Sequence, residues 1–169
     1  MANSKKVSLA MLDLVPVVLF FILGILFYRK MAGVASAADP GFRMGGFFLA
    51  GVLACTVGGF CKVIWKFMIV LTGKDRTVLP KIFRIGMFGG FAVLVLASVF
   101  SGERFLTVLH GMVSFPAVIF LAAGAAGMAL MIVMSAKMEK ESVRANWIEE
   151  GTNTLAQTMF LICLLLAGA

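Results

Sequence analysis

The sequence has few charged residues and few of the side chains that usually carry catalysis or bind metals. Charged residues make up 14% of its 169 residues, and it contains one histidine and three cysteines. An ordinary soluble domain has about 25% charged residues. The cysteines lie in apolar stretches without a CxxC or Cys/His spacing, which argues against a disulfide scaffold and a metal site. We therefore expect no cofactor, no metal and no catalytic residue.

Apolar residues are abundant instead. They form 62% of the chain, and the mean hydropathy is +1.05. A helix needs about 20 mostly apolar residues to cross a bilayer, and continuous runs of this length favour helices over barrel strands. The sequence predicts an all-α, polytopic integral membrane helical bundle that forms a single transmembrane domain over residues 1–169. Five apolar runs predict about five transmembrane helices, at residues 8–28, 44–71, 80–101, 105–136 and 146–168.

Two of these runs carry a local complication. The first follows Lys5 and Lys6, as a secretory signal would, but its length of about 20 residues exceeds the roughly 7–15 of a signal core. We expect it to be retained as a helix. Pro116 lies inside the fourth run, lacks a backbone donor and is expected to kink that helix.

Lysines and arginines in the connectors predict the orientation. They are spread along the chain, so we expect no nucleic-acid partner. A cytoplasmic amino terminus places eight of them on the cytoplasmic side and four outside. The positive-inside rule then favours this orientation, with the carboxyl terminus outside, and the short connectors favour a bacterial inner membrane. The cytoplasmic set is Lys5, Lys6, Lys74, Arg76, Lys81, Lys137, Lys140 and Arg144, and the outer set is Arg29, Lys30, Arg43 and Arg104.

Six ionisable residues besides the histidine remain within the apolar runs. A charge at the bilayer centre costs at least ~2.5–3.5 kcal/mol, so such residues face the bundle interior or reach for the interface. In the predicted topology all six lie near the cytoplasmic level, and three acids balance three bases. We expect them to meet inside the protein, with snorkelling as the alternative for Lys66 and Arg84. The six are Asp13, Lys62, Lys66, Arg84, Glu149 and Glu150.

The last run begins with the strongest polar pattern. Asn146, Glu149 or Glu150, Asn153 and Gln157 recur at steps of three or four residues, so they would form one stripe along a helix. The stripe ends at Gln157 and is followed by apolar residues. This indicates a cavity that opens to the cytoplasm rather than a pore through the bilayer.

We predict a ligand site around this cavity. The lysines would bind an anionic group, the amides would orient it, and the acids would balance charge or carry protons. Trp65, Arg84 and Trp147 are candidates for the pocket wall, with membrane anchoring as the alternative for the tryptophans. His110, far from this level, is interpreted as interfacial. The predicted ligand-binding residues are Asp13, Lys62, Lys66, Glu149, Glu150, Asn153 and Gln157.

Small residues repeat every four positions on several runs, as at Gly86 and Gly90. Such faces allow helices to approach closely. We interpret them as packing surfaces within the chain, with a seam between copies as the alternative.

These patterns favour a small membrane transporter or ligand-binding membrane subunit, with a polar cytoplasmic-side cavity for a small anionic or amphiphilic molecule. One alternative is an intramembrane enzyme that acts on a lipid headgroup or prenyl phosphate. Another is a non-catalytic assembly or accessory subunit. The expected partners are membrane lipids and such a ligand, and a second copy or a larger membrane complex is a further alternative.

Overall fold

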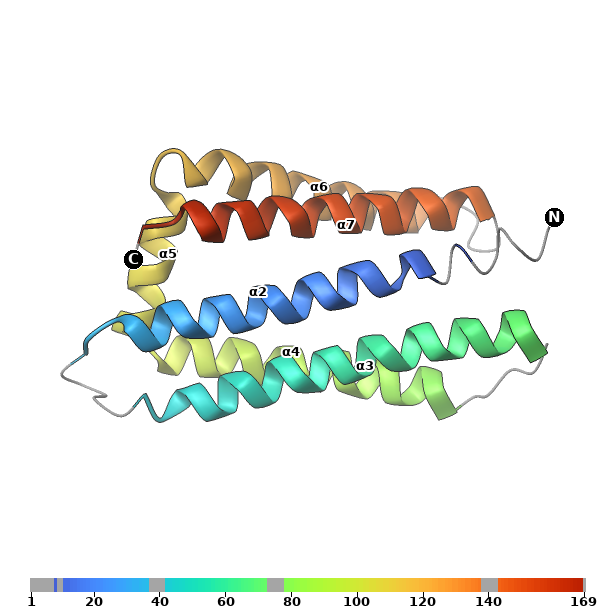
Figure 1. Cartoon of the computed structure of the whole chain (residues 1–169), viewed down its shortest axis with the longest axis horizontal. Coiled ribbons are helices and arrows are strands. Elements are labelled where there is room, and N and C mark those ends of the chain that lie inside the picture. Colours follow the sequence, from blue (N-terminus) through green and yellow to red (C-terminus); the bar gives the residue numbers. More distant parts are fainter. Residues whose placement is uncertain (1–7, 9–10, 37–41, 73–77, 138–142, 169) are drawn as a thin grey trace.

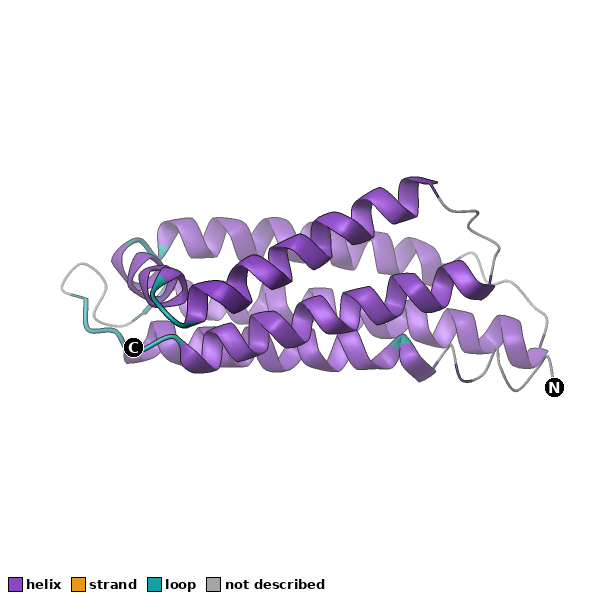
Figure 2. Ribbon diagram, turned by 90° about the horizontal axis from the view of Figure 1, so that it is seen from above, coloured by secondary structure: helices purple, strands orange, loops and turns teal. Residues whose placement is uncertain are grey.

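The described part of the chain consists of helices joined by short connections. The structure is a computed structural model and describes residues 8, 11–36, 42–72, 78–137 and 143–168. Within these ranges there is no strand, and the non-helical residues lie at the ends of the bundle (Figure 2). The helices are α2 (Leu14–Gly33), α3 (Met44–Thr72), α4 (Val78–Phe100), α5 (Glu103–Val113), α6 (Ala117–Lys137) and α7 (Val143–Leu166).

Four of these helices are long and apolar enough to cross a membrane. They are α2, α3, α4 and the segment Ala117–Met134 of α6. A helix satisfies its own backbone hydrogen bonds, which is what the hydrocarbon layer requires. The protein is therefore a membrane-embedded helical bundle, as the composition predicts.

The predicted helix over 105–136 is wrong, because this run forms two helices. α5 ends at Val113 and α6 begins at Ala117, and the backbone at Ser114 is extended (φ −78°, ψ 155°). Pro116 cannot donate a backbone hydrogen bond, and a proline disfavours helical geometry in the residue before it. The expected kink is therefore a complete break, and it allows α5 to lie across one end of the bundle (Figure 1).

The first and last predicted runs also differ from the structure. The first helix extends to Gly33 rather than residue 28, and Lys30 lies in its last turn, where a cation is favourable near the carbonyl end of a helix. α7 has 24 residues but is not among the four apolar helices. Its first half carries the polar stripe, which lowers its hydropathy. Four of the five predicted runs therefore contain a described helix that is long and apolar enough to cross a membrane, and α7 is too polar to be counted with them.

The helices form two antiparallel pairs with α2 between them (Figure 1). α3 packs along α4, α6 packs along α7, and α2 contacts both α3 and α7. The pairs are joined through α2 and α5 rather than by extensive packing of α4 on α6. The start of α2 and the end of α7 lie at opposite ends of the bundle.

Glycines allow the closest helix contacts, as predicted for packing within the chain. A Cβ placed on Gly90 would lie 2.8 Å from the backbone nitrogen of Cys55 on α3. A Cβ on Gly86 would lie 2.9 Å from the carbonyl oxygen of Ala54. The small-residue faces of α3 and α4 therefore face each other, and their backbones approach too closely for larger side chains.

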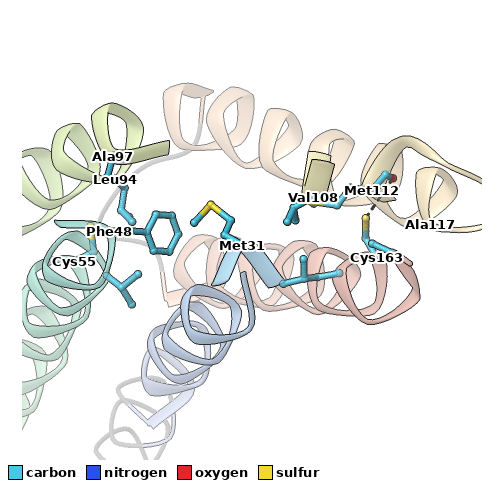
Figure 3. Packing of buried hydrophobic residues seen from close by; sticks show 12 residues of the cluster. Met31, Phe48, Cys55, Leu94, Ala97, Val108, Met112, Ala117 and Cys163 are labelled. Atoms are coloured by element: carbon cyan, nitrogen blue, oxygen red, sulfur yellow. Dashed lines mark hydrogen bonds between the residues drawn. The ribbon is translucent and has the colours of Figure 1, made fainter. Parts of the chain in front are cut away.

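The apolar core lies toward the end of the bundle that carries α5. Met31 of α2 is fully buried there among side chains of α3, α4, α5 and α7 (Figure 3). On the α7 side of this core, the Cys163 thiol donates to the carbonyl of Met112 at 3.7 Å. This packing fixes the spacing between the two helix pairs at that end.

Two cations at the same end bind backbone carbonyls. The buried Arg104 side chain donates to the carbonyls of Met31 at 2.9 Å and of Val34, which lie at the end of α2. Lys30 Nζ donates to the carbonyl of Ala167, just after α7, at 2.5 Å. Cations at such sites satisfy carbonyls that have no partner within their own helix. Two of the four cations assigned to the outer connectors therefore also stabilise the fold.

Candidate functional site

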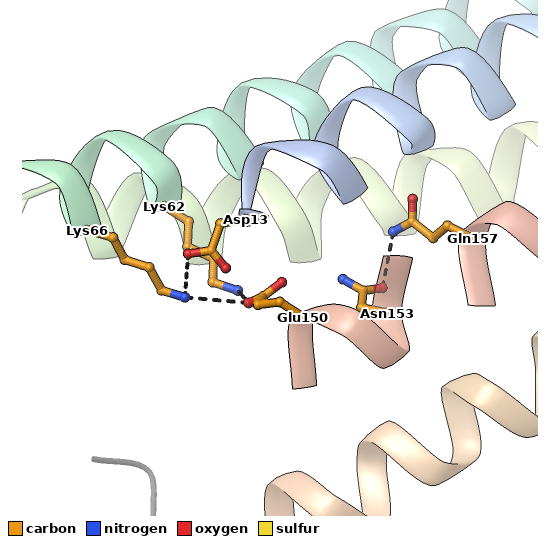
Figure 4. A network of polar contacts seen from close by, with 6 residues as sticks. All are labelled: Asp13, Lys62, Lys66, Glu150, Asn153 and Gln157. Carbon is orange, nitrogen blue, oxygen red and sulfur yellow. Dashed lines mark hydrogen bonds and ion pairs between the residues drawn. The ribbon is translucent and has the colours of Figure 1, made fainter. Parts of the chain in front are cut away.

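Four charged side chains from three helices meet at the other end of the bundle (Figure 4). Lys62 Nζ lies 2.8 Å from Glu150 Oε1. Lys66 Nζ lies 2.5 Å from Asp13 Oδ2 and 3.5 Å from Glu150 Oε1. We call these four residues the charge network. It connects the start of α2, the second half of α3 and the first half of α7.

The two acids of the network are more deeply buried than the two lysines. The side chains of Asp13 and Glu150 are 0% and 3% exposed, whereas those of Lys62 and Lys66 are 27% and 21% exposed. Two acids and two bases give a formal charge of zero. Because an unpaired buried carboxylate is very unfavourable, each acid requires its lysine partner.

Local sequence explains how the network assembles. Lys62 and Lys66 are four residues apart on α3, so they project from one face of that helix. Asp13 is the N-cap of α2, but its carboxylate makes no capping hydrogen bond and pairs with Lys66 instead. Glu150 lies on the side of α7 that faces α2 and α3 (Figure 4).

Two amide side chains continue the polar face of α7 beyond the network. Gln157 Nε2 donates to Asn153 Oδ1 at 3.2 Å, and both side chains point toward α2 and α3 (Figure 4). Gln157 Oε1 is buried and accepts no hydrogen bond from the described residues. An acceptor of this kind is unfavourable unless a further donor reaches it.

A small polar cavity of about 130 Å³ lies beside the network. Its polar lining includes Asp13, Lys62 and Glu150 together with Asn153 and Gln157. Its remaining walls come from α2, α3 and α4, including Pro16, Val17, Phe20, Cys55, Thr56, Gly59, Phe83 and Met87. The Lys62 ammonium also lies 6.0 Å from the centre of the Phe83 ring, within the range of a cation–π contact.

A larger apolar chamber of about 510 Å³ adjoins this cavity. Phe20 and Gln157 line both spaces, so they mark the junction between them. All six helices contribute to the lining of the chamber, which therefore lies between the two helix pairs. On α4 this lining includes Phe91, Val95 and Val99, which are themselves exposed. The chamber therefore reaches the apolar outer surface of the bundle.

The structure brings together most of the predicted ligand-binding residues. Six of the seven, all except Glu149, are in the charge network or the amide pair. Glu149 is half-buried and forms no ion pair with the described residues. The two glutamates diverge because neighbouring residues project about 100° apart on a helix.

The predicted pocket wall differs from the wall of the cavity. Phe20, Phe83 and Met87 line it, and Trp65, Arg84 and Trp147 do not. Arg84 and Trp147 are exposed on their helices, and so is His110 on α5. Exposed positions near helix ends suit the alternative of interfacial anchoring.

Sequence reasoning missed the apolar chamber and its phenylalanine lining. Sixteen phenylalanines spread over all runs give no periodic signal that separates chamber positions from lipid-facing ones. Among the described residues, no group of three or more His, Cys, Asp or Glu is arranged to hold a metal ion. Comparison with models of protein families, with curated proteins and with solved structures finds no match for this chain.

Proposed function

We propose that this protein is a membrane-embedded binding or transport protein for an amphiphilic molecule. The observation that carries the proposal is the junction at Phe20 and Gln157, where a polar cavity meets an apolar chamber. A polar group in the cavity and an apolar chain in the chamber would match the two environments. The chamber volume of about 510 Å³ lies within the range of about 300–1,000 Å³ typical of small-molecule sites.

Charge balance favours an amphiphile over a small anion. Both lysines already contact buried carboxylates, at 2.8 Å and 2.5 Å. An anion that recruited Lys66 would leave buried Asp13 without its lysine partner, and an anion that recruited Lys62 would remove the closest partner of buried Glu150. Either loss is costly. Apolar contacts in the chamber provide binding free energy without disturbing these pairs.

The route of entry follows from the exposed chamber lining on α4. Phe91, Val95 and Val99 lie beside the chamber and also on the outer surface of the bundle. In a bilayer this surface contacts lipid chains. We infer that the ligand enters sideways from the membrane, between α4 and α6.

The same proposal includes the orientation. We infer that α7 crosses the membrane as a fifth span, with its polar stripe sheltered by α2 and α3, and that the charge network lies on the cytoplasmic side. Lys30 and Arg104 bind backbone carbonyls within the protein, so the fold explains why these two cations lie in the outer connectors. When they are left out of the count, the excess of cations on the cytoplasmic side is larger, and the positive-inside rule favours a cytoplasmic amino terminus more strongly. The bacterial inner membrane remains the proposed location.

The test fills the chamber with a side chain. Ser98 is half-buried and lines the chamber, whereas Leu96 on the same helix is exposed and is not part of its lining. Native mass spectrometry of the purified full chain in micelles would measure binding of 1-palmitoylglycerol to wild type, Ser98→Phe and Leu96→Phe. We expect one bound molecule and at least about tenfold weaker binding in Ser98→Phe only, which corresponds to 1.4 kcal/mol. Absence of binding, or equal binding by both variants, would overturn the proposal.

A further inference from the structure

We infer that the charge network binds one proton, which Asp13 carries and shares with Glu150. The proton is then a second ligand of this protein, in addition to the proposed amphiphile, and its site does not depend on that amphiphile. The inference comes from the placement of the two carboxyl groups relative to the two ammonium groups. It gives the network a second state, in which Asp13 is neutral.

The carboxyl group of Asp13 is completely buried, and its hydrogen bonding is incomplete. Lys66 Nζ lies 2.5 Å from Oδ2, but Oδ1 accepts no hydrogen bond from the described residues. Because Oδ1 is itself buried, solvent does not supply the missing donor. A buried carboxylate oxygen without a donor is unfavourable. Protonation reduces this cost, since the neutral carboxyl group carries a hydrogen of its own.

A second carboxyl group lies beside Asp13. Lys66 Nζ is 2.5 Å from Asp13 Oδ2 and 3.5 Å from Glu150 Oε1, so the two acids share one ammonium group (Figure 4). Two carboxylates that share a site repel each other, and this repulsion favours a proton on one of them. The remaining carboxylate can accept a hydrogen bond from the protonated group. The two acids are therefore placed to hold one proton between them.

The lysines determine which acid carries the proton. Among the described residues, the charged groups that face Asp13 are Lys62 and Lys66 of α3 and Glu150 of α7. Glu150 Oε1 has both ammonium groups as neighbours, at 2.8 Å and 3.5 Å, whereas Asp13 pairs with Lys66 alone. Nearby ammonium groups stabilise the ionised form of a carboxyl group. Glu150 therefore stays ionised, and Asp13 takes the proton.

Proton binding leaves neither lysine without a partner. When Asp13 is neutral, Lys62 and Lys66 both keep Glu150 as their counter-ion. The network then contains two ammonium groups and one carboxylate, and the lysine side chains are partly exposed, so water can stabilise the added charge. At the start of α2, the proton replaces an ion pair with α3 by a hydrogen bond with α7.

Infrared spectroscopy tests the site directly, because protonated and ionised carboxyl groups absorb at different frequencies. Exposed aspartates and glutamates are almost fully ionised at about pH 6. Spectra of the purified full-length chain in micelles would be recorded between about pH 8 and about pH 5. We expect about one protonated carboxyl group per chain at about pH 6 in wild type and in the control Glu149→Gln, and none in Asp13→Asn. Absence of this band in wild type, or its persistence in Asp13→Asn, would overturn the inference.

Glu150→Gln tests whether the proton is shared. This variant removes the competing carboxylate and leaves both lysines to Asp13, so Asp13 should ionise and the band should disappear although Asp13 is still present. Persistence of the band in Glu150→Gln would overturn the sharing. If a network variant does not fold, the titration of the wild type still decides whether the proton is bound.

The pH dependence of unfolding provides an independent test. The folded state binds the proton more tightly than the unfolded chain, in which an aspartate has a pKa of about 3.9. Lowering the pH from about 8 to about 5 should therefore stabilise wild type relative to Asp13→Asn, by up to about tenfold in the folding equilibrium constant per pH unit. An aspartate that only forms an ion pair gives no such gain. A ratio that stays flat or falls as the pH is lowered would overturn the inference.

Discussion

Lys62 and Glu150 lie 88 residues apart in the sequence, and their side chains meet at 2.8 Å inside the bundle. This contact joins α3 to α7, two helices that belong to different antiparallel pairs. The Asp13–Lys66 pair adds the start of α2 to the same point. The charge network therefore ties together both halves of the structure at one end, opposite the Arg104 contacts.

We expect loss of one network charge to destabilise the protein. Glu150→Gln would leave Lys62 without its closest partner, and breaking a buried pair typically costs about 3–5 kcal/mol. The free energy of unfolding in mixed micelles would measure this change. Glu149→Gln is the matched control, since Glu149 forms no ion pair with the described residues. Similar losses in both variants would show that the pair contributes nothing.

The double variant Lys62→Met with Glu150→Gln gives a second expectation. Removing both partners leaves no unpaired charge at this contact, so the combined loss should be smaller than the sum of the single losses. A double-mutant cycle of unfolding free energies measures this coupling. Additive effects would mean that the two side chains act independently.

We expect Arg104 to contribute more to the stability of the protein than the exposed Arg84. Arg104→Ala removes hydrogen bonds to carbonyls at the end of α2, and hydrogen bonds to charged groups contribute about 1.5–3 kcal/mol each. We expect a clear fall in the midpoint of thermal unfolding. Arg84→Ala, at an exposed site on α4, should change it little. A larger effect at Arg84 would contradict the assigned role.

Neighbouring glycines on α4 should respond oppositely to alanine. A Cβ at Gly90 meets the Cys55 backbone at 2.8 Å, whereas a Cβ at Gly89 meets nothing within 4 Å. Gly90→Ala should destabilise by about 1–3 kcal/mol through overpacking. Gly89→Ala should be neutral or stabilise by up to about 1 kcal/mol through helix propensity. Comparable unfolding free energies for the two variants would contradict the close contact between α3 and α4 at Gly90.

The proposed orientation predicts where a fused reporter is active. An odd number of spans with a cytoplasmic amino terminus places the carboxyl terminus outside. A periplasmic reporter fused after the last residue should therefore be active, and a cytoplasmic reporter at the same point should be silent. The reverse result would show that α7 does not cross the membrane or that the orientation is inverted.

Much of the bundle could be predicted from apolar run lengths, because hydrocarbon imposes a minimum span on each helix. The break before α6 could not be predicted in full. A proline in a membrane helix can either kink the helix or terminate it. Here the helix terminates, because α5 packs across the end of the bundle. The polar first half of α7 was predicted from its three- and four-residue spacing, and Glu150, Asn153 and Gln157 do face α2 and α3 (Figure 4).

The charge network was predictable in part for a similar reason, because four of the six charged residues expected to meet do so, whereas Arg84 and Glu149 do not. Buried charges need partners of opposite sign. Asp13, Lys62 and Lys66 are predicted at the same depth in the membrane, so pairing between them was expected. The sequence did not distinguish Glu149 from Glu150, since that choice depends on how α7 rotates against α2. Arg104 was used only to predict the orientation from the sequence. Its contacts with backbone carbonyls could not be predicted, because every residue type has a backbone carbonyl.

α5 contributes Phe105 and Met112 to the chamber lining, and the chamber also reaches the apolar outer surface of α4. A molecule that enters there from the membrane, as proposed, would exchange with the surrounding lipid. Its occupancy would then follow its mole fraction in the surrounding lipid rather than its concentration in water, so dilution of the aqueous phase would leave the bound fraction unchanged while added lipid would lower it.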